Sequence, residues 1–82
     1  MKVVITPQAV KQFKRLSKVS QRKIKKRISL LSSKPLSGKK LIGSLVEIRS
    51  LRSWPYRILY FINKKKRIVY IVTIAHRQGV YK

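Results

Sequence analysis

Apolar residues follow two different spacings in this chain, and the change from one to the other sets its fold class. Up to residue 31 they recur every three or four residues, as in Val10, Phe13 and Leu16, which is typical of amphipathic helices. From residue 44 onward they fall into short runs rich in Val, Ile, Tyr and Phe, which is typical of strands. The 82 residues suffice for one domain, which we expect to span residues 1–82.

Local signals predict where the helices begin. Residues 2–5 form a first short strand, and Thr6 followed by Pro7 predicts a helix start, because proline is favoured directly after a hydroxyl N-cap. Ser20 is the expected N-cap of a second helix. Its apolar face is expected to carry Ile24, Ile28 and Leu31. Turn-type residues predict a loop at 32–44.

Three strands are expected after the loop, at residues 44–51, 56–63 and 67–76. The short turn at 63–66 makes the last two antiparallel neighbours. Strict alternation then assigns two faces to the last strand: Tyr70, Val72, Ile74 and His76 on one, and Val69, Ile71, Thr73, Ala75 and Arg77 on the other. The fold class is therefore α+β, a small antiparallel sheet of about four strands with an N-terminal two-helix hairpin on one face.

The charge balance excludes several kinds of chemistry. The net charge is +21, and Glu47 is the only acidic side chain. Mechanisms that need two carboxylates, or a Ser-His-Asp triad, are excluded within one chain. Cysteine is absent, which excludes zinc–thiolate sites and disulfides, and one His with one Glu makes a poor metal site, so no metal or cofactor is expected. Without a signal-peptide pattern or a long apolar run, a cytoplasmic protein is expected.

The positive charge predicts acidic partners. Nucleic acid is the first candidate and an acidic protein the second, because a field of this sign attracts polyphosphate backbones and carboxylates. The first 40 residues carry ten Lys and three Arg, whereas the remaining 42 carry four Lys and five Arg. Arginine offers a planar fork for fixed phosphate geometry, so an ordered phosphate site is expected on the strands.

Three stretches of sequence together resemble a known family. They are Leu36-Ser37-Gly38-Lys39-Lys40-Leu41, then Glu47-Ile48-Arg49 leading to Tyr56-Arg57-Ile58-Leu59-Tyr60, and finally His76-Arg77 with Val80-Tyr81. In this order, in a small basic chain, they resemble the RelE/ParE toxin superfamily of toxin–antitoxin modules. The similarity covers nearly the whole chain, and the family fold is a small antiparallel sheet flanked by two helices.

The resemblance implies a toxin that a cognate antitoxin holds inactive. RelE-like members cleave mRNA, commonly in the ribosomal A site, whereas ParE-like members poison DNA gyrase. By similarity, Arg57 contacts the scissile phosphate, Arg77 is similarly placed, and the C-terminal tyrosine of the family corresponds to Tyr81. Some relatives place a catalytic histidine near the C-terminus, and His76 is the candidate here.

The residues themselves suit metal-free RNA cleavage by the 2′-hydroxyl of the substrate. Arg57 and Arg77 suit charge stabilisation, whereas proton transfer is left open among His76, Tyr81 and Glu47. Glu47 has the alternative of pairing with a nearby arginine. Contacts to RNA are expected from Arg49, Arg52, Lys39, Lys40 and Trp54. We expect Trp54 at a hairpin tip, and Tyr60, Phe61 and Tyr70 in the sheet core.

The leading hypothesis is a toxin that cleaves mRNA on translating ribosomes and is neutralised by an acidic antitoxin. The alternatives are a ParE-like inhibitor of DNA gyrase and a non-catalytic RNA-binding protein. No membrane partner is expected.

Overall fold

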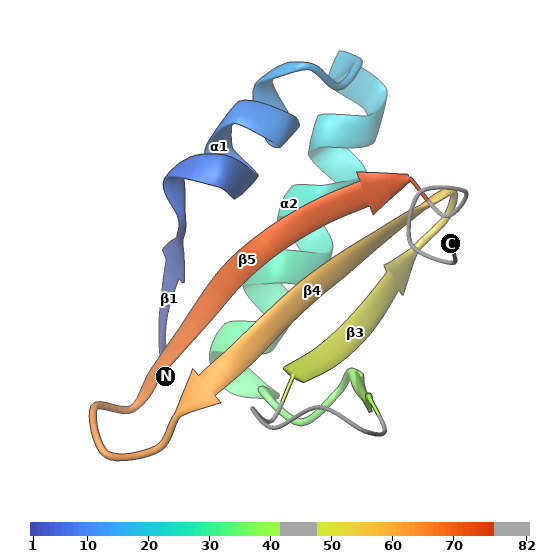
Figure 1. Ribbon diagram of the computed structural model, residues 1–82. Coiled ribbons are helices and arrows are strands. Elements are labelled where there is room, and N and C mark those ends of the chain that lie inside the picture. Colours follow the sequence, from blue (N-terminus) through green and yellow to red (C-terminus); the bar gives the residue numbers. More distant parts are fainter. Residues whose placement is uncertain (42–47, 77–82) are drawn as a thin grey trace.

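A computed structural model describes residues 1–41 and 48–76 of the chain (Figure 1). Within these residues, two helices and five strands follow in the predicted order, with one short strand added. Their bounds are β1 Lys2–Ile5, α1 Pro7–Lys14, α2 Lys18–Ser33, β2 Lys39–Lys40, β3 Ile48–Ser53, β4 Tyr56–Asn63 and β5 Ile68–His76. Neither described helix has the length and apolar character needed to cross a membrane.

The strands form one sheet in the order β1-β5-β4-β3-β2. The predicted α+β class is confirmed, and β3, β4 and β5 pair antiparallel as expected. Two features go beyond the prediction. The sheet is mixed, because β1 pairs with β5 in parallel, and the loop contains the two-residue β2, which pairs with β3. The first and last described strands are therefore neighbours, and the two helices carry the chain from β1 at one edge of the sheet to β2 at the other.

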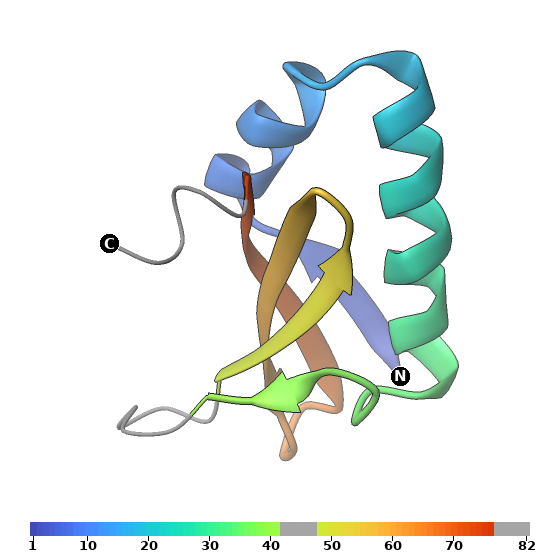
Figure 2. The same ribbon diagram turned by 90° about the vertical axis from the view of Figure 1, so that its right-hand side faces the viewer.

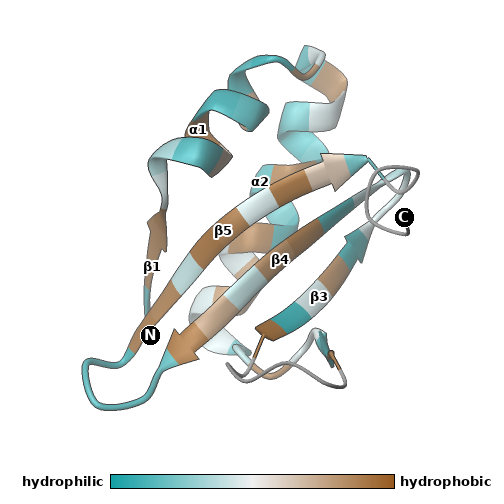
Figure 3. Ribbon diagram, in the orientation of Figure 1, coloured by the Kyte–Doolittle hydropathy of each residue, from teal (hydrophilic) through white to brown (hydrophobic). Residues whose placement is uncertain are grey.

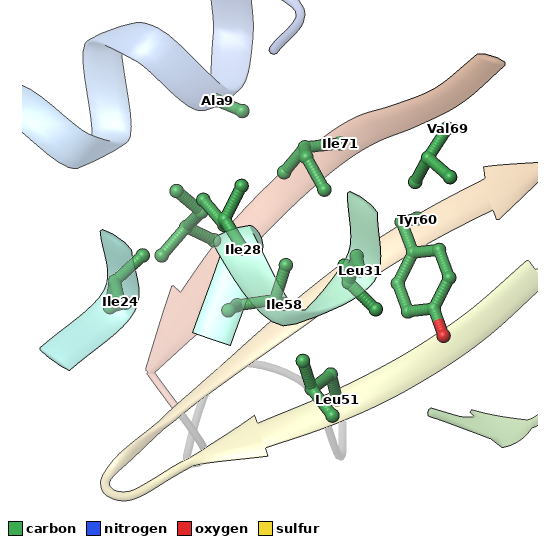
Figure 4. Close-up of a cluster of buried hydrophobic side chains, with 10 residues drawn as sticks. Ala9, Ile24, Ile28, Leu31, Leu51, Ile58, Tyr60, Val69 and Ile71 are labelled. Carbon is green, nitrogen blue, oxygen red and sulfur yellow. The ribbon is translucent and has the colours of Figure 1, made fainter. Parts of the chain in front are cut away.

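The core lies between the helices and one face of the sheet. Helix α2 lies across that face, and α1 packs against β5 (Figures 1 and 2). The predicted apolar face of α2 is confirmed, because Ile24, Ile28 and Leu31 are all buried. They meet side chains from β3, β4 and β5 together with Ala9 of α1 (Figure 4). The core is Ala9, Ile24, Ile28, Leu31, Leu51, Ile58, Tyr60, Val69, Ile71 and Ile74.

The helix starts are partly as predicted. Thr6 precedes α1 and Pro7 opens it, but the Thr6 hydroxyl donates to the Ile71 carbonyl at 2.8 Å and ties the start of α1 to β5. The prediction of Ser20 as the N-cap of α2 was wrong. Ser17 is the N-cap, and its hydroxyl oxygen accepts from the Ser20 amide at 3.2 Å. Serine is a favoured N-cap residue at either position, and α2 begins after the earlier of the two.

A β-bulge in β5 changes the predicted faces of that strand. Leu59 pairs with Thr73 and Tyr60 with Ile71, so Val72 is the extra residue between them. An extra residue inverts the alternation beyond it, so Val69, Ile71 and Ile74 are all buried toward the helices. The prediction that grouped Ile74 with Tyr70, and Thr73 with Ile71, was therefore wrong. Helix α1 supports the bulge, because the Gln12 side-chain oxygen accepts from the Ile74 amide at 2.7 Å.

Candidate functional site

The sheet face opposite α2 carries the arginine that the sequence singled out. Along β4, Ile58 and Tyr60 are buried on the helix side, so the alternating residues Arg57 and Leu59 point to the other face. In both β3 and β4, a hydrophilic residue lies close to the turn that joins the two strands (Figure 3). We call this surface the open face, and its residues in the strand register are Ile48, the buried Ser50, Arg52, Arg57, Leu59, Phe61, Tyr70, Thr73 and Ala75.

Two arginines lie directly opposite each other on the open face. Arg52 of β3 is the register partner of Arg57 of β4, and Ala75 of β5 is the partner on the other side of Arg57. Arg52 is exposed, whereas Arg57 is half-buried beside the small alanine. Like charges directly opposite in a sheet are destabilising, so this pair is unfavourable for folding in itself. The pair therefore concentrates positive charge on this face of the sheet, and an anion bound between the two groups would offset their repulsion.

Aromatic rings lie on the same face, four residues beyond Arg57 along β4. Phe61 and Tyr70 are register partners, and their rings stack at 5.0 Å with an angle of 22°. Both are half-buried on the face opposite the helices, so the prediction that placed them in the core was wrong. Both lie among apolar residues that occupy the two faces of their strands, so the sequence does not indicate to which face each ring points. Tyr60 is buried in the core, as predicted.

His76 of β5 is next to Ala75, the register partner of Arg57, but its side chain points to the opposite face of the sheet from Arg57. It is the register partner of Tyr56, and the two rings meet edge to face at 5.5 Å and 87°. Tyr56 packs against the core, so this pair lies on the helix side of the sheet at the end of β5. The His76 side chain is exposed there. The structure thus places Arg57 and His76 on opposite faces of adjacent strand ends.

Arg49 contributes to a buried hydrogen-bond cluster beneath β2. Its Nη1 donates to the Gly38 carbonyl at 3.0 Å. The Tyr60 hydroxyl donates to the Pro35 carbonyl and accepts from the Gly38 amide, both at 2.8 Å. Together these bonds hold the segment before β2 against the sheet, and so position the exposed Lys39. The polar role of Tyr60 was missed, because a tyrosine between apolar residues in a strand gives no sign of a distant backbone partner.

Burial raises the pKa of the Tyr60 phenol above its ordinary value, although the bond from the Gly38 amide and the charge of Arg49 oppose this shift. The unfolded chain ionises its tyrosines near pH 10, whereas native Tyr60 keeps its proton to higher pH. Because native Tyr60 holds its proton more tightly than unfolded Tyr60, its protonated form contributes stability fully below about pH 10. That stability is lost as the pH rises toward the native pKa. Between about pH 9 and pH 11, urea unfolding of wild type should lose more stability than that of Tyr60→Phe. If the free energy of unfolding changed equally with pH in the two proteins, the raised pKa of Tyr60 would be contradicted.

The remaining predicted site residues are distributed as follows. Lys39 and Lys40 form β2, pairing with Ser50 and Arg49, and both are exposed. Trp54 lies in the turn between β3 and β4, as predicted, with 60% of its surface exposed. Glu47, Arg77 and Tyr81 lie outside the described residues. Within residues 1–41 and 48–76, no three His, Cys, Asp or Glu side chains gather into a group able to hold a metal ion.

Comparison with known proteins agrees with this architecture. Residues 3–81 match the family model described as the ParE toxin of the type II toxin–antitoxin system parDE. Curated protein sequences gave no match. Among solved structures, a chain of the toxin–antitoxin complex RelBE2 from Mycobacterium tuberculosis is 29% identical, with a TM-score of 0.83 over 93% of this chain and 96% of that one.

Two other solved structures are similar. A chain of the archaeal RelE–RelB complex from Pyrococcus horikoshii is 26% identical, with a TM-score of 0.81 over 93% of each chain. A chain of the intact RelBE toxin–antitoxin complex from Escherichia coli is 22% identical, with a TM-score of 0.79 over 92% of this chain and 94% of that one. At that identity, the last likeness concerns the fold alone.

Proposed function

We propose that this chain, which belongs to the family of ParE toxins of type II toxin–antitoxin systems within the RelE/ParE superfamily, cleaves mRNA on translating ribosomes without a metal ion. The observation that carries the proposal is the Arg52–Arg57 pair on the open face. Two adjacent guanidinium groups are unfavourable for folding but suit a phosphodiester, which each of them can bind with a fork of donors. The nearby Phe61–Tyr70 stack offers apolar surface to a base.

The proposed reaction uses the 2′-hydroxyl of the substrate as nucleophile. Its oxygen loses a proton and bonds to phosphorus, the bond from phosphorus to the 5′-oxygen breaks, and that oxygen takes up a proton. The products are a 2′,3′-cyclic phosphate and a 5′-hydroxyl end. Arg57 stabilises the negative charge that gathers on the phosphoryl oxygens, because fixed donors act most strongly where charge develops.

The other catalytic assignments rest on the sequence. Arg77 is proposed to share the phosphate with Arg57, since it is two residues beyond Ala75, the register partner of Arg57. Proton transfer is proposed for Tyr81, Glu47 or His76. The orientation of His76 toward Tyr56 favours the first two over the histidine. Lys39 and Lys40 are proposed to contact RNA at the sheet edge, with Arg49 holding their segment in place.

The proposed protein partner is a cognate acidic antitoxin. The M. tuberculosis and P. horikoshii structures are toxin–antitoxin complexes, and a chain with 22 basic and one acidic side chain needs a partner of opposite charge. An amphipathic helix or strand that folds on binding, across the sheet or the helical hairpin, satisfies this requirement.

Inhibition of DNA gyrase is a second candidate function. It is favoured by the match to ParE toxins and by the separation of His76 from Arg57 on opposite faces. On this alternative, induction of the protein damages DNA while mRNA stays intact, and His76→Ala changes nothing.

The ribonuclease proposal is tested by incubating the purified protein with mRNA, both free and on translating ribosomes. We expect cleavage that leaves 5′-hydroxyl ends, because the 5′-oxygen is the leaving group. Such ends distinguish this reaction from hydrolysis by a contaminating nuclease that leaves 5′-phosphates. Intact mRNA under both conditions contradicts the proposal.

A further inference from the structure

An open groove of about 480 Å³ runs between α2 and the turn that joins β3 to β4. It lies on the flank of the molecule, beside the open face. Three of its lining residues come from α2 and three from the end of β3 and the turn. They are Lys23, Lys26, Arg27, Arg52, Ser53 and Trp54.

The two walls of the groove are tied together. The guanidinium of Arg27 donates twice to the Arg52 carbonyl, through Nε at 3.0 Å and Nη2 at 2.9 Å. A planar guanidinium bonded through two nitrogens has little freedom to rotate. This contact fixes the distance between α2 and β3, so the groove exists before any ligand binds and binding does not have to order its walls.

The wall formed by the turn presents a large exposed ring. Trp54 is the single tryptophan of the chain, and 60% of its surface is exposed. Tryptophan is highly buried on average, so the exposed part of this ring offers an unusually large flat apolar surface beside the groove.

The wall formed by the helix is strongly basic. Lys23 and Lys26 are exposed on α2, three residues apart and therefore on the same side of the helix. The same two lysines line a second depression of about 290 Å³ further along α2, with Val19 and Arg22. Four of the six groove residues carry positive charge, and none of the six is acidic. An anionic ligand that also carries a flat apolar surface would complement both walls.

We propose that the groove binds a single-stranded segment of RNA, with one base stacked on Trp54 and the adjoining phosphates on Lys23 and Lys26. A single strand supplies both flat bases and regularly spaced charge, and aromatic rings with cationic neighbours are the usual means of binding it. Arg52 lines the groove and is also the register partner of Arg57, so a strand leaving the groove reaches the open face through Arg52. The inference rests on the proposed function, in which mRNA is the substrate, and adds a second contact surface for it.

Trp54 supplies a direct reporter for the test. The probe is a short oligoribonucleotide with 2′-O-methyl groups, which lacks the nucleophile and stays uncut. We expect it to quench Trp54 fluorescence saturably, whereas inorganic polyphosphate, which has charge but no bases, binds without this quenching. With a dye-labelled oligonucleotide followed by anisotropy, Trp54→Ala should weaken binding by about 5- to 150-fold, the value of one stacked base. Trp54→Phe, which keeps a ring, should weaken it less.

The lysines are tested by salt dependence. Replacing both Lys23 and Lys26 by alanine should lower the slope of log affinity against log salt by about 1.4, because two phosphate contacts are lost. The matched control replaces Lys65 and Lys66, in the turn between β4 and β5 at the other end of the sheet, by alanine (Figure 1). It removes the same charge and should leave the slope within a few tenths of wild type.

Each outcome decides between the groove and the proposed function. If the oligonucleotide binds without changing Trp54 fluorescence, or if the groove variants bind and cleave mRNA like wild type, the groove inference is wrong and the ribonuclease proposal stands. If Trp54 is quenched and the lysines matter but mRNA is never cut, the groove stands and the ribonuclease proposal is wrong. Quenching by an oligoglutamate peptide but not by the oligonucleotide overturns the inference in favour of an acidic protein partner.

Discussion

Replacing Arg57 by alanine is expected to reduce mRNA cleavage by about 10²- to 10³-fold, the usual effect of removing one fixed donor from a developing oxyanion. Arg57 is half-buried on the open face, and its neighbours across the strands are Arg52 and Ala75. The substitution also relieves the repulsion between two like charges that face each other across the strands. The measurement is the rate of appearance of 5′-hydroxyl ends on a defined mRNA, with urea unfolding alongside.

Two companion variants separate charge from geometry. Arg57→Lys keeps the charge but loses the planar fork, so its activity should lie between those of wild type and Arg57→Ala. Lys65→Ala removes one exposed charge from the turn at the other end of the sheet and should cleave like wild type. If Arg57→Ala cleaves at the wild-type rate while correctly folded, the phosphate site has been placed on the wrong residue.

Gly38→Ala is expected to cost about 2–4 kcal/mol of stability, combining overpacking with a weakened buried hydrogen bond. A Cβ at this position meets the Tyr60 hydroxyl at 2.6 Å, Tyr60 Cε1 at 2.8 Å and the Ser50 carbonyl at 3.0 Å. Tyr60 cannot move aside cheaply, because it is fully buried and its hydroxyl is bonded to both Pro35 and Gly38. For a chain of this length the loss is a large part of a total of about 4–12 kcal/mol.

A double-mutant cycle tests the cause of that loss. Tyr60→Phe alone leaves the Pro35 carbonyl and the Gly38 amide without their buried partner, at about 1–3 kcal/mol. Because it also removes the nearest clashing atom, Gly38→Ala should cost at least about 1 kcal/mol less in the Tyr60→Phe background than in wild type. The neighbouring Lys39→Ala, at an exposed position, is the control for a substitution in this segment. Strictly additive losses, or wild-type stability of Gly38→Ala, would show that the segment is held in another way.

The sequence predicted the elements that carry a strong local signal. Residues 2–5 and 56–63 are rich in strand-forming residue types and were placed with their observed bounds. The buried stripe of α2 was identified from its periodicity, which reports burial directly. The bulge at Val72 was not predicted, because β5 is apolar on both faces and an inserted residue leaves no interruption in the pattern. The strand β2 was missed, because two exposed lysines carry no strand signal of their own.

The kinds of residue at the candidate site could be predicted from the sequence, but their arrangement in space could not. Arg57 was singled out because an arginine inside an apolar strand needs a reason, and the structure places it opposite Arg52. The face that His76 occupies depends on the register between β5 and β4. The contact of α2 with the end of β3, next to the β3–β4 turn, depends on tertiary packing through the hydrogen bonds of Arg27. Neither relationship is local in the sequence, so the groove could not be predicted from it.

The most direct test of the central claim is to induce the protein in growing cells and map the 5′-hydroxyl ends of the mRNA, with DNA damage followed in the same cultures. Wild type should arrest growth and produce new ends within translated regions while the DNA stays intact, and Arg57→Ala should produce neither arrest nor ends. Growth arrest with intact mRNA and damaged DNA would contradict the ribonuclease account and favour gyrase as the target.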